Sequence, residues 1–234
     1  MSDSEVIKYF NKNQFLKLNR AGQFYLIPAM FFPFIASIFY FSIFEGGAVA
    51  QGIYLAAKIF IFVYPLFFIS KTDSFKNAFR FKEKEFLLGF TVGVAIFAVG
   101  YALIQVPWLW QEIQRATPFV KAKIDGFGVA EHYLLMAIVI SFLHSMLEEY
   151  YWRWFVFGAS KSNIASAVAF SLHHFIVLDF YFPVFVALIL TAMVAIGGIM
   201  FNFLYSRKKN VWGAWSAHVL VDLFIFYVGY VLLQ

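Results

Sequence analysis

The sequence predicts an all-α protein, a polytopic bundle of transmembrane helices. Of its 234 residues, 62% are hydrophobic and 13% are charged, whereas a soluble domain is nearer half apolar and a quarter charged. A water-soluble fold of this length has too much surface to hide so many apolar side chains. The apolar residues also come in blocks of about 20, the length that an α-helix needs to cross hydrocarbon. Strands of a membrane barrel would instead give short alternating segments.

The chain divides into an N-terminal segment and one transmembrane domain. Residues 1–21 are polar and mixed in charge, which predicts an amphipathic, interfacial segment, and residues 22–234 form a single helical domain. A longer polar segment, Gln111–Glu131, separates the third apolar block from the fourth. About seven blocks predict the spans, which are Tyr25–Phe44, Gly52–Ile69, Phe86–Val106, His132–Phe157, Ile164–Leu178, Phe182–Tyr205 and Trp212–Leu233.

Lysine and arginine gather in alternate loops, and this asymmetry predicts the orientation in the membrane. The loop after the third span carries Arg115, Lys121 and Lys123, diluted by acidic residues. The N-terminal segment and the other basic loops fall on the opposite side, which predicts a cytoplasmic N-terminus. Brief loops favour a bacterial plasma membrane. The basic residues on the predicted cytoplasmic side are Lys8, Lys12, Lys17, Arg20, Lys71, Lys76, Arg80, Lys82, Lys84, Lys161, Arg207, Lys208 and Lys209.

Composition excludes two classes of function. The chain has no cysteine, so disulfides, thiolate catalysis and cysteine-ligated metals are excluded. The formal charge of +5 comes from residues in short loops, where it indicates membrane topology and not a nucleic-acid surface. The expected partners are therefore the lipid bilayer and a membrane-associated substrate, and the sequence leaves the oligomeric state open.

Ionisable groups inside a span are costly and mark functional sites. The first three spans carry one, Lys58, which either snorkels to the interface or lines a cavity and has no predicted function. The last four spans carry the others, so residues 131–228 are predicted to hold the catalytic core. These residues are His144, Glu148, Glu149, Arg153, His173, His174, His218 and Asp222.

Helical spacing pairs several of these side chains, because positions four apart share a face. Glu149 is therefore expected to be neutralised by Arg153 on its own helix. Glu148 points about 100° away and must find partners on other helices. The pairs predicted in this way are His144 with Glu148, Glu149 with Arg153, and His218 with Asp222.

Glu148, His174 and His218 fall at similar depths from the same side of the membrane, which predicts one site. A carboxylate held out of bulk water is a stronger base near neutral pH and can activate water. An imidazole N–H or the Asn202 amide could then donate to a developing oxyanion. The alternative is that Glu148, His174 and His218 bind a divalent metal with water in an open position. The chain lacks the His-Glu-x-x-His string of the zinc helix, so no cofactor is expected.

Three motifs in this half resemble those of one family of intramembrane endopeptidases. The string Glu148-Glu149-Tyr-Tyr-Trp-Arg153 matches EExxxR, Phe170 to His174 resembles FxxxH, and His218 to Asp222 resembles HxxxN. Together and in this order they are similar to the CAAX-protease and bacteriocin-processing (CPBP) family, over roughly Leu134 to Phe226. The resemblance implies a glutamate-dependent, metal-independent peptidase whose site opens toward the cytoplasm.

The resemblance also implies roles for individual residues. Glu148 would activate water, His174 would assist it or bind the oxyanion, and His218 would complete the site. Where the family has Asn, this chain has Asp222, whose ionised carboxylate cannot donate to an oxyanion and is expected to orient His218. Supporting roles are expected for Glu149, Arg153, His144, which has no counterpart in the motifs, and His173, which is expected to face elsewhere and to be structural.

The substrate is expected to be a membrane-associated peptide or protein, and the sequence does not say whether it is prenylated. The alternative function is a non-catalytic member of the same fold, acting in immunity, scaffolding or transport. A proton-coupled transporter would also place charged groups in a bundle, but usually in both halves.

Overall fold

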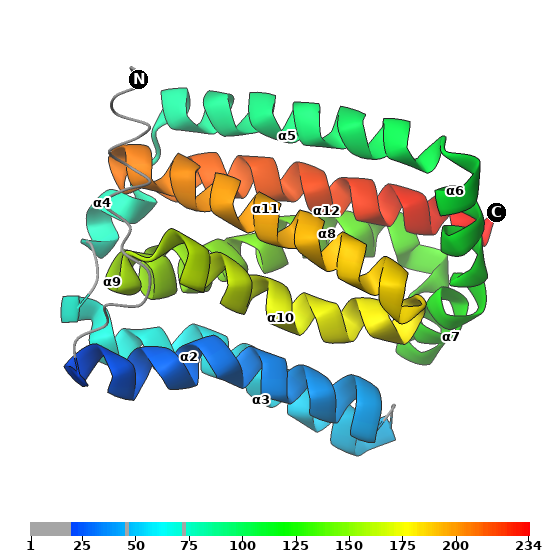
Figure 1. Cartoon of the computed structure of the whole chain (residues 1–234), viewed down its shortest axis with the longest axis horizontal. Helices are drawn as coiled ribbons and strands as arrows, with labels where there is room; N and C mark the ends of the chain where they lie inside the picture. Colours follow the sequence, from blue (N-terminus) through cyan, green and yellow to red (C-terminus); the bar gives the residue numbers. More distant parts are fainter. Residues whose placement is uncertain (1–19, 45–46, 72–73) are drawn as a thin grey trace.

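The computed structural model describes residues 20–44, 47–71 and 74–234. Almost all of the predicted interfacial segment, residues 1–21, lies outside the described residues. The described residues confirm the predicted fold class, an all-α transmembrane bundle whose helices run side by side (Figure 1). Within these described ranges, seven helices are long and apolar enough to span a membrane: Phe24–Ile43, Gly47–Ile69, Glu83–Ile104, Ala130–Ser160, Asn163–Tyr181, Val184–Lys208 and Trp212–Leu233.

Most spans are single α-helices, and three change their helical type along their length. The single helices are α5 (Glu83–Ile104), α10 (Asn163–Tyr181), α11 (Val184–Lys208) and α12 (Trp212–Leu233). The first span joins α2 (Arg20–Ile38) to η1 (Phe39–Ile43), and the second joins α3 (Gly47–Val63) to η2 (Tyr64–Lys71). The fourth consists of η3 (Ala130–His132), α8 (Tyr133–Glu148), η4 (Glu149–Phe157) and α9 (Gly158–Ser160).

The short connecting helices lie at opposite ends of the bundle. The helices α4 (Phe75–Phe79) and α9 lie at one end, and α6 (Pro107–Arg115) and α7 (Thr117–Phe127) lie at the other (Figure 1). The polar segment after the third span is thus largely helical. At the α4 end, Lys82 donates to the carbonyl of Lys208 at 3.2 Å, and the Asn210 amide donates to the carbonyl of Arg80 at 2.8 Å. Two basic loops therefore meet at one end, as the predicted topology requires.

Small residues bring α5 and α12 into backbone contact. A Cβ atom added to Gly89 would lie 1.8 Å from the Gly213 carbonyl oxygen, and one added to Gly93 would lie 2.9 Å from the Cα of Ala217. Small residues spaced by four allow such close approach between membrane helices, where van der Waals packing replaces the hydrophobic effect. This contact fixes the depth of α12 and hence of His218, the residue after Ala217.

The segment η4 lies at the centre of the bundle, and all nine of its residues are buried. Two tyrosines tie it to the N-terminal helices. Tyr151 donates to the Ala29 carbonyl on α2 at 2.6 Å, and Tyr150 donates to the Phe62 carbonyl on α3 at 2.9 Å. Two of its rings pack edge-on against the C-terminal helices: Trp152 lies 5.7 Å from Phe170 on α10, and Phe157 lies 6.0 Å from Tyr205 on α11, between ring centroids. Helices from both halves of the chain therefore hold η4 in place.

Candidate active site

The two glutamates of the EExxxR motif lie where the helix changes type. Glu148 is the last residue of α8, and Glu149 begins the π-helix η4. A π-helix has i→i+5 hydrogen bonds, is rare, and often occurs at functional sites. The adjacent carboxylates are both buried, at 3% and 0% exposure, and take different partners.

Glu148 lies among histidines from three helices. Its Oε1 is 3.3 Å from Nε2 of His144 on α8 and 3.6 Å from Nε2 of His173 on α10. Its Oε2 is 3.8 Å from Nε2 of His218 on α12. Within the described part of the chain, no hydrogen-bond donor reaches Oε2. The carboxylate thus has one oxygen near two imidazoles and one buried oxygen without a hydrogen bond.

Glu149 is instead bound within the protein. Its Oε1 is hydrogen-bonded to Nδ1 of His218 at 2.8 Å, and its Oε2 is 3.2 Å from Nε of Arg153. The predicted ion pair between Glu149 and Arg153 is present, and both side chains are completely buried. Because a carboxylate can only accept, His218 carries a proton on Nδ1.

Arg153 also packs on aromatic rings that belong to the site. Its guanidinium carbon lies 4.4 Å from the ring centroid of Phe170 and 5.3 Å from that of Phe201. Phe201 in turn stacks on the imidazole of His218, with the ring centroids 5.1 Å apart. Stacking on the face of a ring is favourable for a guanidinium whose N–H groups are removed from water. The guanidinium and the imidazole that flank Glu149 are therefore positioned by the same aromatic side chains.

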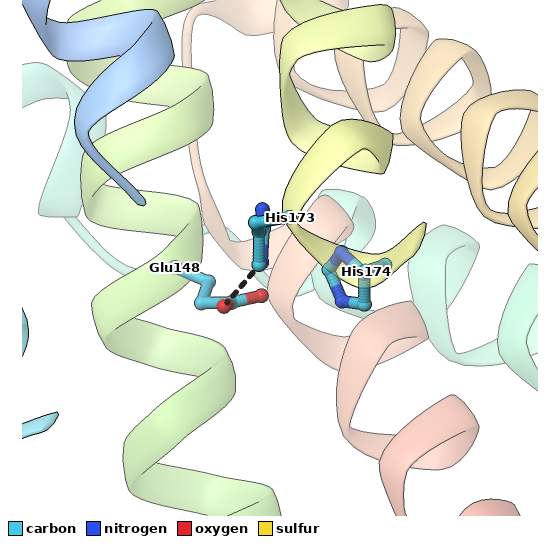
Figure 2. A group of neighbouring side chains, drawn as sticks. All are labelled: Glu148, His173 and His174. Carbon is cyan, nitrogen blue, oxygen red and sulfur yellow. Dashed lines mark ion pairs between the residues drawn. The ribbon is translucent and has the colours of Figure 1, made fainter. Parts of the chain in front are cut away.

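The two adjacent histidines of α10 both reach the site, with ring centroids 4.0 Å apart. His173 was expected to face elsewhere, yet it contacts Glu148 while its ring lies parallel to that of Trp152. Figure 2 shows both imidazoles beside the Glu148 carboxylate. His174 has its Nδ1 2.9 Å from the Phe170 carbonyl oxygen. A carbonyl only accepts, so Nδ1 carries the proton, and the neutral ring has a lone pair on Nε2.

Asp222 and Lys58 complete the cluster. Asp222 Oδ1 lies 3.6 Å from Nε2 of His218, which agrees with the predicted i, i+4 pair. Lys58, on α3, places its Nζ 3.0 Å from Nδ1 of His144. Sequence reasoning singled out Lys58 as the one ionisable residue of the first three spans but gave it no partner. Its position inside an apolar block was the available signal.

The Asn202 amide does not lie free to bind an oxyanion. Its Nδ2 donates to Oδ1 of Asn163 at 2.9 Å and to Oγ of Ser166 at 2.7 Å. Asn202 is completely buried. Its amide therefore joins α11 to α10, and the suggestion that it serves the reaction is wrong.

The donor atoms also permit a metal-binding arrangement. Glu148, His173 and His174 each offer one ligand atom, and these atoms lie within 4.8 Å of one another. Two or three histidines with a carboxylate are a known zinc set, in which neighbouring ligand atoms lie about 3.4 Å apart. A Nδ1–H bonded to a backbone carbonyl, as in His174, is typical of a metal-binding histidine. The residues fit a divalent metal if their ligand atoms move slightly closer together, and His173 takes the place of the expected His218 in this set.

The three motifs, separated in the sequence, thus form one cluster of buried and half-buried side chains across α8, η4, α10 and α12. Residues 130–224 match the Rce1-like family model, described as type II CAAX prenyl endopeptidase Rce1-like. The expected resemblance to the CAAX proteases is confirmed over this segment. Neither a curated protein nor a solved structure matches the chain. At the level of the family, the Rce1-like match supports a CAAX-type membrane protease, and the seven apolar helices make the chain a multi-pass membrane protein.

Proposed function

We propose that this chain is an intramembrane endopeptidase that hydrolyses a peptide bond with water activated by Glu148. The observation that carries the proposal is the buried Glu148 carboxylate, held at Oε1 by two imidazoles while Oε2 has no donor among the described residues. A carboxylate in this environment is suited to act as a general base. Glu149 is less suited to this role because its Oε1 is hydrogen-bonded to His218 and its Oε2 is ion-paired at 3.2 Å with the permanently charged Arg153, although this oxygen also has no hydrogen-bond donor among the described residues.

The position of His174 supports a water held between two bases. One water that makes two hydrogen bonds of about 2.8 Å spans about 4.6 Å between its partners. The ligand atoms of Glu148 and His174 lie within 4.8 Å of each other. Because Nδ1 of His174 donates to Phe170, Nε2 accepts. We therefore assign His174 to orienting the water, and of the two expected roles this geometry favours assistance over oxyanion binding.

In the proposed reaction, Glu148 takes a proton from the water, and the hydroxide adds to the carbonyl carbon of the scissile peptide bond. His218 has carboxylate oxygens near both nitrogens, so we propose that it carries a proton on each and donates from Nε2 to the oxyanion. The carbon–nitrogen bond then breaks as Glu148 passes its proton to the leaving amine. The protons and charges balance, and Glu148 returns to its carboxylate form.

A metal-dependent reaction is the alternative mechanism for the same site. Glu148, His173 and His174 would hold the ion, which would act as a Lewis acid toward the substrate carbonyl and its water. The metal-independent reaction is our proposal because Glu148 already has imidazole partners and a free oxygen for a water.

The proposed substrate is a peptide or protein at the membrane, and the family description suggests a C-terminal segment of a prenylated protein as one candidate. We further propose that the protein lies in a bacterial plasma membrane with its site toward the cytoplasm. Support comes from the basic loops, of which two meet at the α4 end of the bundle.

The test is cleavage of a diverse peptide library, prenylated peptides included, by the detergent-purified protein beside Glu148→Gln, each with and without a strong chelator. We expect cleavage that requires Glu148 and ignores the chelator. Glu131→Gln is the matched control, because Glu131 is exposed on η3, at the opposite end of the fourth span. Loss with chelator would establish the metal alternative. Absence of Glu148-dependent cleavage from the whole library would favour a non-catalytic role in immunity, scaffolding or transport.

A further inference from the structure

Lys58 is a charged residue on an otherwise apolar transmembrane helix. A lysine inside a span is costly and is retained where it has a partner. On α3 the side chains of Leu55, Ile59 and Phe62 are exposed, at 60%, 52% and 57%. In a membrane this face meets lipid. Lys58 lies instead on the stripe of the buried Ala50 and Ile61 and so faces the bundle.

The partner of Lys58 is an imidazole that touches the proposed base. Its Nζ lies 3.0 Å from Nδ1 of His144, and Nε2 of the same ring lies 3.3 Å from Oε1 of Glu148. The three side chains thus form a chain of contacts from α3 to the end of α8. Lys58 lies outside residues 130–224, the segment that matches the family model.

The ammonium group of Lys58 determines which nitrogen of His144 accepts a hydrogen bond and which one donates. An ammonium group has three donors and no acceptor, so Nδ1 of His144 must accept. In the neutral ring the proton then lies on Nε2, the nitrogen that faces Glu148. Glu148 favours the same tautomer, because its carboxylate also only accepts. Without Lys58 this preference rests on one long contact of 3.3 Å, and the ring can more often carry its proton on Nδ1 and present a lone pair to the carboxylate.

We propose that Lys58 is a positioning residue of the candidate active site. It holds His144 as the Nε2–H tautomer, and this N–H holds Oε1 of Glu148, which leaves Oε2 to take the proton from water. The contact of 3.3 Å is long for a hydrogen bond, and such bonds commonly tighten only when substrate binds. This inference rests on the proposed role of Glu148 for its effect on the reaction, but not for the tautomer itself.

The first arm of the test reads the tautomer without any substrate. The full-length protein is labelled with ¹⁵N at its histidine rings, and the His144 signals are assigned by their loss in His144→Gln. We expect Nε2–H in the wild type, and a shift toward Nδ1–H in Lys58→Met. Lys58→Arg should retain the wild-type signals, because a guanidinium also only donates. Lys121→Met is the control, since Lys121 is exposed on α7. An unchanged His144 tautomer in Lys58→Met would overturn the proposal.

The second arm measures cleavage of a peptide that the wild type hydrolyses. We expect Lys58→Met to lower kcat about 10- to 100-fold, the same range as the loss of a partner that orients a metal-binding histidine, with little change in KM. Lys58→Arg should recover most of kcat. In a His144→Gln background, Lys58→Met should have little further effect, because the two residues act through one contact. Equal kcat for wild type and Lys58→Met would contradict the inference.

The two arms separate this inference from the proposed function. If Glu148→Gln cleaves as well as the wild type, the proposed function fails, and the ring-nitrogen signals still decide whether Lys58 sets the tautomer. If Lys58→Met is poorly folded, Lys58→Leu takes its place, since its side chain likewise offers no donor to Nδ1 of His144.

Discussion

Glu149 is joined to His218 across 69 positions of sequence by a hydrogen bond of 2.8 Å, whereas the carboxylate of its neighbour Glu148 lies within 3.8 Å of imidazole nitrogens of three histidines. Two adjacent and chemically identical side chains are therefore placed in different surroundings. One connects η4 to α12, and the other faces the centre of the cluster. We therefore expect substitutions of Glu149 to lower both stability and activity, and substitutions of Glu148 to lower activity alone.

Glu149→Gln and Arg153→Ala should lower thermal stability as well as activity. Arg153→Ala leaves the Glu149 carboxylate buried without its cation, and breaking a buried pair in this way costs about 3–5 kcal/mol. Thermal unfolding in detergent measures the effect, with Glu148→Gln beside it as a variant expected to be inactive but folded. If Glu149→Gln and Arg153→Ala both prove as stable and as active as the wild type, the pairing has no structural role.

His174→Leu should reduce kcat with little change in KM or stability. The side chain hydrogen-bonds to the backbone of its own helix and to no other described residue, and losing a group that assists proton transfer typically costs about 10²–10⁴-fold in rate. Steady-state kinetics on a cleaved peptide provide the measurement. His132→Leu is the control, because His132 is exposed on η3. A rise in KM at constant kcat would instead assign His174 to substrate binding.

Asp222→Asn should retain most of the activity. The asparagine keeps an oxygen that can accept from Nε2 of His218, which lies 3.6 Å from Oδ1 of Asp222. Asp222→Ala removes this acceptor and should lower the rate further. The comparison of kcat for the two variants checks whether position or charge matters. Complete loss in Asp222→Asn would show that the negative charge is required.

Gly89→Ala should destabilise the fold, although alanine is the better helix former. The added Cβ would meet the Gly213 carbonyl at 1.8 Å, and overpacking of this kind typically costs about 1–3 kcal/mol. Gly197→Ala is the matched control, because nothing lies within 4 Å of a Cβ at Gly197. Thermal unfolding should rank Gly89→Ala below wild type and Gly197→Ala at or above it. The reverse order would contradict the close approach of α5 and α12.

The absence of cysteine allows the orientation to be measured with single substitutions. Lys161 lies between α9 and α10 and Lys121 lies on α7, and both side chains are exposed, so each can be replaced by cysteine. A cytoplasmic N-terminus places Lys161 inside and Lys121 outside. A membrane-impermeant maleimide should therefore label Lys121→Cys in intact cells and Lys161→Cys only after permeabilisation. The opposite pattern would reverse the proposed topology.

Apolar block length was sufficient to predict the spans. The predicted Trp212–Leu233 span has the observed bounds, and the predicted Tyr25–Phe44 differs by one residue at each end. The i, i+4 rule also identified the pair of Glu149 with Arg153, even though these residues lie in a π-helix. Side-chain reach along one helix is a local property, so sequence spacing captures it.

Contacts between helices were harder to predict, because they depend on the rotation and depth of each helix. Sequence spacing alone placed His173 away from Glu148, but α10 is rotated so that Glu148 lies beside both of its histidines. The same limit applies to Asn202, whose amide is used by Asn163 and Ser166 on α10. The change from the α-helix α8 to the π-helix η4 at Glu149 was also not predicted from residue spacing.

The contact between Lys58 and His144 has a consequence for protein engineering. Residues 130–224 are the part that a family comparison recognises, and a chimera would naturally be cut at that boundary. Such a chimera would transplant three motifs without the side chain that touches His144. A functional graft must therefore carry α3 along with them, or supply a basic residue at the same depth on a foreign helix.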